Sequence, residues 1–445
     1  MTLEAEIRTF LSSVSENYDT LEYLYNKRFE NFIPSETPVY YSGPYWDDEE
    51  IVAMMQSIIG GKWITSGEQV KRFEVLFSRK FNLGSSVMVN SGSSANLALI
   101  GAVKKYLNWN DGDEIIISAV GFPTTLAPVI QHDLTPVLID IELETLNFDL
   151  ELIEEKITDK TRAIFLSPVL GNPPDMDRLL EICEKHGLEL ILDNCDSLGS
   201  KWRGKFLNEY AIASSCSFYP AHHISTGEGG MVSSNVDEIV KIARSLAWWG
   251  RDCYCVGAAN LLPCGSCGNR FDRWLPGYDG IVDHKYIFTT IGYNLKPLDL
   301  QGAVGIVQLE KFEEIHARRQ HSKRTLQQIL EETVEAIKIP QALPEADTCW
   351  FGTPIICKDR ETKQKLVNTF ESNKVQTRNY FAGNILLQPA YRHIDDASKY
   401  PNSNIVLDRV FFIGAAPHYN EDVFDYIRGI LQAEKEEDLV TAPSH

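Results

Sequence analysis

The chain has 445 residues, of which 44% are hydrophobic, and its 42 basic and 62 acidic side chains give a formal net charge of −20 at neutral pH. This charge disfavours non-specific binding to nucleic acid or to anionic membranes, so neither is expected as a partner. No apolar run is long enough for a transmembrane helix, and residues 1–30 lack the basic start and uninterrupted apolar core of a signal peptide. We therefore expect a cytoplasmic protein.

The first 45 residues are predicted to form a helical arm, and residues 46–310 to form a large domain in which helices and strands alternate. Residues 70–81 place apolar side chains on one helical face, and residues 93–107 form a second helix that serines can cap. Short apolar segments between helices predict a parallel sheet that is covered on both faces. These strands are expected at residues 114–118, 163–168, 188–193 and 230–234.

A long charged helix is predicted over residues 309–337. The mixed segment that follows indicates a second, smaller α/β domain, which would occupy residues 311–445. The predicted fold class is therefore α/β, with a mostly parallel sheet in the large domain and a smaller C-terminal domain.

Polar residues follow the ends of several predicted strands, where a parallel sheet gathers functional side chains. In the stretch VNSGSSANLALI, Ser93 and Ser94 lie at the start of a helix whose free N–H groups can bind a phosphate. An ordinary serine-capped helix would give the same pattern. Asp193 ends the apolar strand 188–193, where a buried carboxylate suits a cationic ring nitrogen. A helix cap is the alternative role for Asp193.

Two further stretches carry candidate residues. Phe122 in SAVGFPTT follows a strand, and it can stack on a flat ring or serve as one more core aromatic. In SFYPAHHISTGEGG, Ser217 lies five positions before His222 and can reach a phosphate. This glycine-rich loop contains no lysine.

The order and spacing of these motifs over residues 45–430 resemble the DegT/StrS-type sugar aminotransferases, which have the aspartate aminotransferase fold and use pyridoxal phosphate. The matching stretches also include WITSGEQVKRFE and IGYNLKPLDLQGAVGIVQLEK. The resemblance implies a fold-type I homodimer in which Asp193 pairs with the pyridine nitrogen and Phe122 stacks on the ring. It assigns the phosphate to Ser93, Ser94 and Ser217, with Asn294 reaching the cofactor phosphate of the partner subunit.

In this resemblance His222 occupies the position of the cofactor-binding lysine, and His223 follows it. Because an imidazole cannot hold the aldehyde covalently, the resemblance implies non-covalently bound pyridoxamine 5′-phosphate (PMP). Imidazole can still accept a proton near neutral pH. The substitution resembles the 3-dehydratases of 4-keto-6-deoxy nucleotide sugars, in which the histidine removes a proton and the C3 hydroxyl of the sugar leaves. The alternative is a degenerate aminotransferase in which His222 merely fills the loop.

Five of the nine cysteines need a separate explanation. Cys195 follows the strand of Asp193, and the others crowd a loop at residues 250–270. Four thiolates hold a [2Fe-2S] cluster, and this distribution resembles the cluster-bearing CDP-4-keto-6-deoxyglucose 3-dehydrase. That resemblance implies as ligands Cys195, Cys253, Cys255 and Cys267, with Cys264 as the alternative to Cys267. A structural zinc site is the other interpretation.

The resemblance implies removal of the C3 hydroxyl from an NDP-4-keto-6-deoxyhexose, CDP-linked as in that dehydrase, with electrons from a flavin/iron–sulfur reductase. By the same resemblance Arg378 and Asn384 lie near the sugar. Three alternatives stay open: a 3-dehydratase that uses PMP alone, an aminotransferase that uses another lysine such as Lys296, and a non-catalytic sugar-nucleotide or redox sensor. Lipopolysaccharide O-antigen sugars and antibiotic deoxysugars are both compatible products.

Overall fold

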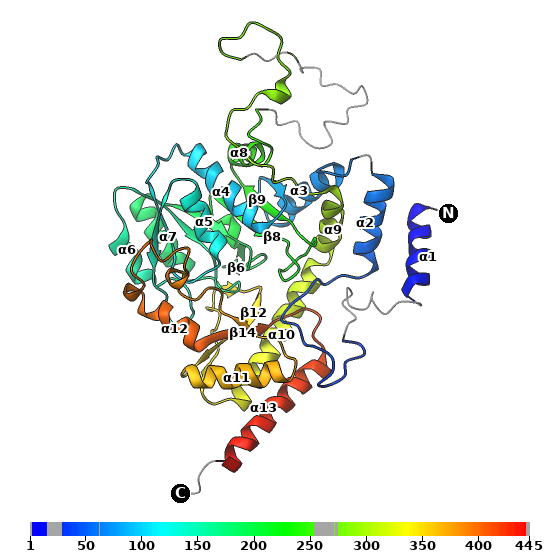
Figure 1. Cartoon of the computed structure of the whole chain (residues 1–445), viewed down its shortest axis with the longest axis vertical. Coiled ribbons are helices and arrows are strands. Elements are labelled where there is room, and N and C mark those ends of the chain that lie inside the picture. The colour runs from blue at the N-terminus through cyan, green and yellow to red at the C-terminus, as the bar shows by residue number, and fades with distance from the viewer. Residues whose placement is uncertain (1, 16–28, 62, 253–270, 272–274, 442–445) are drawn as a thin grey trace.

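The computed structural model of the protein describes residues 2–15, 29–61, 63–252, 271 and 275–441. Figure 1 shows a central sheet with helices on both of its faces and a smaller sheet next to it. The helices are α1 (Leu3–Ser15), α2 (Asp48–Gly60), α3 (Glu68–Lys80), α4 (Gly92–Tyr106), α5 (Pro123–Gln131), α6 (Ile153–Lys156), α7 (Met176–His186), α8 (Asp237–Ala247), α9 (Asp299–Glu310), α10 (Phe312–Thr333), α11 (Arg360–Ser372), α12 (Pro401–Arg409) and α13 (Glu421–Thr441). The strands are β1 (Ser85–Val89), β2 (Glu114–Ser118), β3 (Thr135–Ile139), β4 (Thr161–Leu166), β5 (Glu189–Asp193), β6 (Lys201–Trp202), β7 (Lys205–Phe206), β8 (Ala213–Ser217), β9 (Gly230–Ser234), β10 (Ile337–Lys338), β11 (Ala346–Asp347), β12 (Gly352–Cys357), β13 (Arg378–Asn379) and β14 (Val410–Gly414).

The central sheet has seven strands in the order β1-β9-β8-β5-β4-β2-β3. Its strands β8, β5, β4, β2 and β3 pair in parallel. The predicted parallel sheet is therefore confirmed, except at β9, which runs antiparallel to both β8 and β1. Only the loop 218–229 connects β8 to β9, which leaves no room for a crossover helix, so the chain turns back beside β8.

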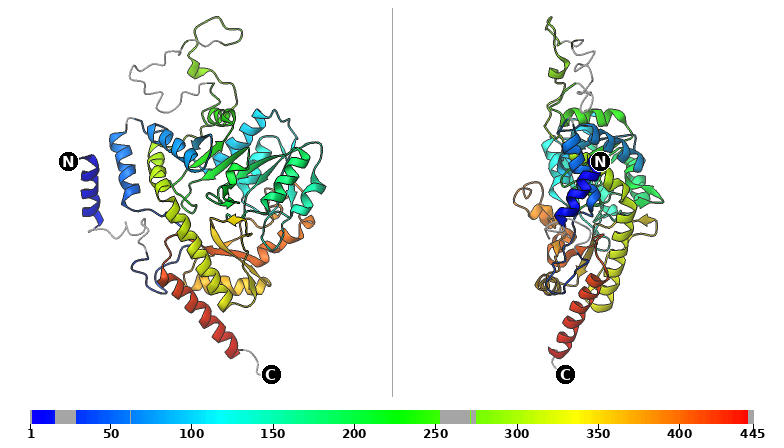
Figure 2. Two further views of the ribbon diagram at one scale, coloured as in Figure 1. Left: turned by 180° about the vertical axis from the view of Figure 1, so that it is seen from behind. Right: turned by 90° about the vertical axis from the view of Figure 1, so that its right-hand side faces the viewer.

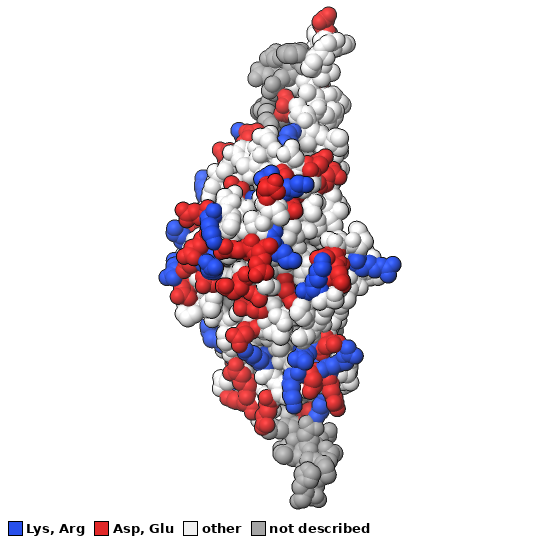
Figure 3. Space-filling model, turned by 90° about the vertical axis from the view of Figure 1, so that its left-hand side faces the viewer, with Lys and Arg blue, Asp and Glu red and all other residues white. Residues whose placement is uncertain are grey.

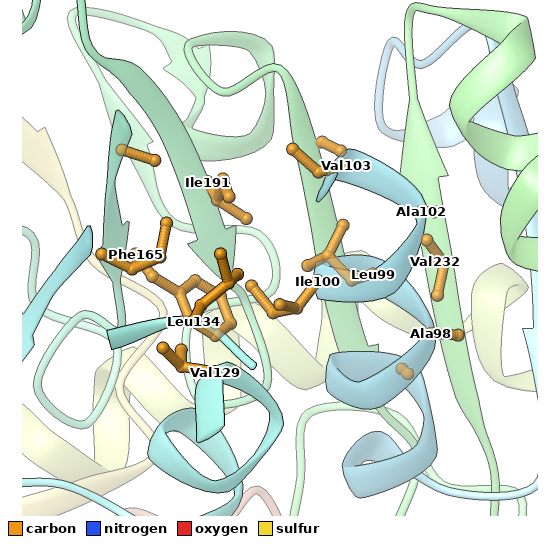
Figure 4. Close-up of a cluster of buried hydrophobic side chains, with 14 of the residues drawn as sticks. Ala98, Leu99, Ile100, Ala102, Val103, Val129, Leu134, Phe165, Ile191 and Val232 are labelled. Atoms are coloured by element: carbon orange, nitrogen blue, oxygen red, sulfur yellow. The ribbon is translucent and has the colours of Figure 1, made fainter. Parts of the chain in front are cut away.

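The strands of the central sheet are apolar because helices cover both of its faces. In β2, Ile115 and Ile117 belong to the apolar cluster formed with α4, α5 and α8, whereas Ile116 belongs to the cluster on the α7 side. Alternate side chains of one strand are thus buried on opposite faces, which explains the continuous apolar run of residues 114–118. Figure 4 shows α4 against the sheet, with buried side chains such as Leu99 between them.

The helices predicted over residues 70–81 and 93–107 are confirmed as α3 and α4. The long helix predicted over residues 309–337 is α10, which has the shorter bounds Phe312–Thr333. Residues 309 and 310 belong to the preceding helix α9. Lys311 lies at the junction, and its Nζ contacts Glu50 Oε2 at 2.7 Å at the start of α2.

A second sheet, antiparallel and four-stranded in the order β10-β12-β14-β13, forms from the chain that follows α10. Helices α10, α11 and α13 pack with it in an apolar cluster of its own, which includes Leu326, Phe370 and Phe424. A separate sheet with its own core is what a second domain requires. The bounds 1–45, 46–310 and 311–445 stay predictions.

Several described segments lie at the periphery of the molecule. Helix α1 packs on α2 through apolar side chains that include Ile7, Leu11 and Val52. The segment 275–291 projects beyond α8, and α13 extends from the opposite end (Figure 2). One face gathers acidic side chains among scattered basic ones (Figure 3), in keeping with the net charge of −20. Among the helices of the described residues, none combines the length and the apolar character needed to span a membrane.

Candidate functional site

A cavity of about 940 Å³ lies where the carboxyl ends of β1, β2, β5 and β8 meet, on the side that faces the second sheet. This is where ligands bind in parallel α/β sheets. Its lining includes the predicted site residues Ser93, Phe122, Asp193, Cys195, Ser217 and His222. A second cavity, of about 490 Å³ between α1, α2, α3 and α9, is lined by none of them.

The N-terminus of α4 forms one wall of the larger cavity. Ser91 caps the helix, because its side chain accepts a hydrogen bond from the Ser94 N–H at 3.1 Å. Ser91 Oγ also donates to Ser94 Oγ at 3.1 Å, so the Ser94 side chain belongs to the cap and does not line the cavity. Ser93 does line it. The N–H groups of this first turn lack partners within the helix and can bind an anion.

Two glycines let this turn approach the neighbouring strands. A Cβ at Gly92 would lie 2.4 Å from Cβ and 2.8 Å from Oγ of Ser217, at the end of β8. A Cβ at Gly230 would lie 2.2 Å from the backbone oxygen of Ser91. Because neither position has a side chain, the Ser217 hydroxyl and the first turn of α4 lie side by side and form a cradle of phosphate size.

Asp193 lies at the floor of the cavity and is only 4% exposed. Its Oδ2 accepts hydrogen bonds from Thr125 Oγ1 at 2.7 Å and from Asn96 Nδ2 at 2.8 Å. Its Oδ1 accepts one from the Cys195 N–H at 3.2 Å. These neutral donors fix the orientation of the carboxylate, and no cationic side chain among the described residues pairs with it, which suits a positively charged ring nitrogen.

Phe122 is not a core aromatic, since 55% of it is exposed at the cavity. Its ring touches only the edge of Phe381 among the ring contacts of the described residues, with centroids 6.5 Å apart and an interplanar angle of 74°. The face of the ring is therefore available to stack on a flat ligand.

His222 lies on the cavity wall with 15% of its side chain exposed. Its Nδ1 lies 3.3 Å from Oδ1 of Asp196, within ion-pairing distance but not aligned as a hydrogen bond. The ring of Phe351 packs against the imidazole with centroids 5.2 Å apart, and that of Tyr219 lies at 6.3 Å. The imidazole is thus held between a carboxylate and two aromatic rings.

His223 has a different environment, although it adjoins His222 in the sequence. It is 2% exposed, does not line the cavity, and its Nε2 donates to the Cys349 carbonyl oxygen at 2.7 Å. Burial and the charge of Arg319 hold the pKa of His223 well below its ordinary value. His223 is therefore a neutral structural residue, and His222 is the one that can act on a ligand.

Cys195 is half-buried in the cavity wall, where burial and the charge of Asp193 raise the pKa of its thiol well above the ordinary value. The remaining predicted ligands, Cys253, Cys255, Cys264 and Cys267, lie outside the described residues. Among the residues that the structure does describe, no group of three or more His, Cys, Asp or Glu side chains is arranged to hold a metal ion.

Asn294 and Lys296 lie outside the cavity of their own chain. Lys296 donates to Asn294 Oδ1, and its Nζ lies 3.3 Å from the centroid of the Trp249 ring. Burial lowers the pKa of Lys296 to about 8. Asn384 is fully buried and caps a turn behind the cavity lining, with its Oδ1 accepting from the Leu386 N–H at 3.0 Å. Its place near the sugar stays a prediction.

Arg378 does line the cavity, with its guanidinium stacked 4.4 Å from the centroid of the Tyr41 ring. Three further residues that matter to the site, Asp196, Tyr219 and Phe351, are absent from the sequence-based prediction. Asp196 and Tyr219 stand within the motifs of Asp193 and His222, so their proximity in sequence was the available signal. Phe351 comes from a distant part of the chain and has no local signal.

Known proteins resemble this chain in sequence and in structure. The sequence profile of the DegT/DnrJ/EryC1/StrS aminotransferase family matches residues 46–432. The chain belongs to this family. The family assignment confirms the resemblance in the motifs and, with the observed sheet order, the predicted fold class.

Within the DegT/DnrJ/EryC1/StrS family, two curated relatives and one solved structure are informative. The dTDP-4-dehydro-2,6-dideoxy-D-glucose 3-dehydratase of Saccharopolyspora spinosa is 39% identical over 408 residues, which cover 89% of this chain and 86% of that protein. The lipopolysaccharide biosynthesis protein RfbH of Salmonella typhimurium is 35% identical and covers 89% of this chain and 91% of its own. The structure of E. coli GDP-4-keto-6-deoxy-D-mannose-3-dehydratase with bound hydrated PLP superimposes with a TM-score of 0.77 at 28% identity, covering 88% of this chain and 99% of that one.

Proposed function

We propose that the protein is a PMP-dependent 3-dehydratase that removes the C3 hydroxyl of an NDP-4-keto-6-deoxyhexose. The observation that carries the proposal is that His222 lines the same cavity as Asp193, Ser93 and Ser217. By the resemblance in the motifs, His222 stands at the position of the cofactor-binding lysine of the aminotransferases. Among the described residues that line the cavity, none is a lysine. The similarity to two sugar 3-dehydratases supports the same class of reaction.

The side chains of the cavity fit a phosphorylated pyridine. The Asp193 carboxylate would pair with the ring N–H, Phe122 would stack on the ring, and the first turn of α4 with Ser217 would bind the phosphate. When bound, this cofactor supplies an electron sink that lets a carbon next to its ring lose a proton. The unpaired charge of Asp193 and the missing side chain of Gly92 are the features that favour this ligand over a neutral one.

His222 would take up this proton as a general base. Asp196 Oδ1 lies 3.3 Å from Nδ1, so a small rotation would let Nδ1–H donate to it and leave Nε2 as the proton acceptor. A second role, returning the proton to the departing hydroxyl, is consistent with a single imidazole in the cavity.

We extend the proposal to a [2Fe-2S] cluster held by Cys195, Cys253, Cys255 and Cys267, with Cys264 as the alternative fourth ligand. The support is the place of Cys195 in the cavity wall, two residues after Asp193, together with the spacing of the other cysteines in the sequence. A redox centre there could receive electrons from a flavin/iron–sulfur reductase and deliver them to the substrate. A purely structural zinc site would give no reason for a thiol beside the cavity.

The substrate is proposed to be a nucleotide diphosphate sugar, CDP-linked by resemblance, whereas the named relatives act on dTDP- and GDP-linked sugars. Arg378 supports this choice, because it is the one arginine or lysine among the described residues of the cavity lining. A guanidinium binds phosphate oxygens in a bidentate manner, and stacking on Tyr41 holds Arg378 ready for it.

We also propose a homodimer in which Asn294 reaches the cofactor phosphate of the partner subunit. Asn294 is exposed and lies outside its own cavity, which an in-trans role requires. Large apolar side chains near it in the chain or in space are also exposed, including Ile291 at 95% and Ile64 at 72%. A monomer seldom leaves such side chains in water, so a protein interface is expected here.

The proposal is tested on protein purified without air. The visible spectrum should show an iron–sulfur envelope with about two irons per subunit, and CDP-, dTDP- and GDP-linked 4-keto-6-deoxyhexoses should be compared as substrates. Oxygen-18 from water should exchange into the C3 hydroxyl of the true substrate. A covalent lysine adduct after borohydride treatment, for example at Lys296, would instead support an aminotransferase. Ligand binding without exchange would support a sensor.

A further inference from the structure

Arg319, on α10, is a fully buried arginine behind the wall that carries His222. Its Nη2 donates to the carbonyl oxygen of His222 at 2.9 Å and to that of Ala221 at 3.2 Å. Its Nη1 donates to the carbonyl oxygen of Phe351 at 3.3 Å. One side chain therefore holds the backbone of the loop that presents His222 and the backbone of the aromatic residue that packs on the imidazole.

This arrangement is costly for folding. All three acceptors of Arg319 within the described residues are neutral carbonyl groups, and its Nε has no hydrogen-bond partner there. Burying a guanidinium without a carboxylate partner is unfavourable, and burial lowers the pKa of Arg319 to about 10. What Arg319 provides in return is hydrogen bonds to three backbone carbonyl groups of the cavity wall.

We propose that Arg319 is a positioning residue for the general base, fixing His222 and Phe351 relative to each other and to the cavity. The inference rests on the proposed role of His222. Arg319 lies on the helix that leads from the central sheet to the second sheet, so it joins the loop 221–223 to the start of β12. A planar guanidinium holds converging carbonyl groups in a more fixed geometry than the flexible ammonium group of a lysine does.

Other side chains hold the loop on either side of His222 but do not bind its carbonyl oxygen. Ser42 Oγ donates to the carbonyl oxygen of Ala221 at 2.7 Å. His223 binds the Cys349 carbonyl oxygen at 2.7 Å, which ties down the residue after the base. The backbone of His222 itself is held by Arg319 and by the turn in which its N–H donates to the Tyr219 carbonyl oxygen at 3.0 Å. Without the guanidinium, three buried carbonyl oxygens would lose a donor, and the imidazole could move away from Asp196.

The test compares Arg319→Met with Lys323→Met in the full-length protein. Lys323 is a matched control, because it is a cation on the same helix, 3% exposed, whose Nζ donates to the Pro340 carbonyl oxygen at 3.3 Å and not to the His222 loop. Hydrogen–deuterium exchange of peptides covering residues 219–226 is measured without substrate. We expect Arg319→Met to speed this exchange about tenfold, and Lys323→Met to leave it unchanged.

The kinetic readout should separate positioning from binding. Arg319→Met should lower kcat by roughly 10- to 100-fold and change KM by less than about threefold, since misplacing a base by about 1 Å acts on the chemical step. Arg319→Lys should recover part of both effects.

Equal effects of the two methionine variants, or unchanged exchange in Arg319→Met, would overturn the proposal. If Arg319→Met does not fold, Arg319→Gln replaces it. If the unaltered protein shows no dehydration, the proposed function fails, while the exchange comparison still tests the role of Arg319.

Discussion

Gly92→Ala should weaken binding of the phosphorylated cofactor without unfolding the protein. The added Cβ would lie 2.4 Å from Cβ and 2.8 Å from Oγ of Ser217, whereas carbon atoms in contact are about 3.5–4.0 Å apart. The Ser217 backbone cannot yield, because it belongs to β8 and pairs with Gly230 of β9. The Ser217 side chain and the first turn of α4 must therefore separate by about 1 Å.

This separation should cost the cradle one hydrogen bond to the phosphate. A hydrogen bond to a charged group contributes about 1.5–3 kcal/mol, so the Kd for the cofactor should rise by roughly 10- to 150-fold. The assay is a titration of cofactor-free protein with pyridoxal phosphate, followed by absorbance. Ser217→Ala should show a similar loss, because it removes the hydroxyl directly. Gly429→Ala is the control, since a Cβ at this position in α13 meets nothing within 4 Å.

A Kd for Gly92→Ala within about threefold of the native value would refute the reasoning, because it would correspond to less than one charged hydrogen bond. A loss in Gly92→Ala without a loss in Ser217→Ala would contradict only the role of the hydroxyl. The phosphate would then depend on the N–H groups of α4, which the added methyl group also displaces.

The other predictions concern the base and the cluster. His222→Lys should abolish removal of the C3 hydroxyl, but borohydride should then fix the aldehyde cofactor covalently to the chain, which mass spectrometry detects. Near-native dehydration by His222→Asn would contradict the role of His222 as the base. Cys253→Ser should lose iron but keep PMP binding and part of the oxygen-18 exchange. A complete loss of exchange in a folded, PMP-loaded variant would show that cluster assembly and dehydration are inseparable. Cys264→Ser should keep about the native iron content, and Cys267→Ser should lose most of it, because contacts around the cluster cannot replace a thiolate ligand. The reverse result would assign the fourth ligand to Cys264.

The sequence by itself determined the parts of the site that follow strands. Asp193 and Ser217 are the last residues of β5 and β8, and Phe122 follows β2, so the chain order of apolar runs and polar ends was enough to predict them. The carboxyl ends of parallel strands meet at one edge of a sheet, and residues placed there in sequence must meet in space. His222 was identified by the family resemblance, which places it at the position of the cofactor-binding lysine in the loop after β8.

The tertiary structure alone decided which neighbours these residues have. It turned His222 to the cavity and His223 to the Cys349 carbonyl, and it placed Phe351 on the imidazole. Local patterns carry strand and helix periodicity, but they do not specify contacts between distant segments. The convergence of Ala221, His222 and Phe351 on one buried arginine depends on such contacts, because Phe351 and Arg319 lie far from the loop 221–223 in the chain.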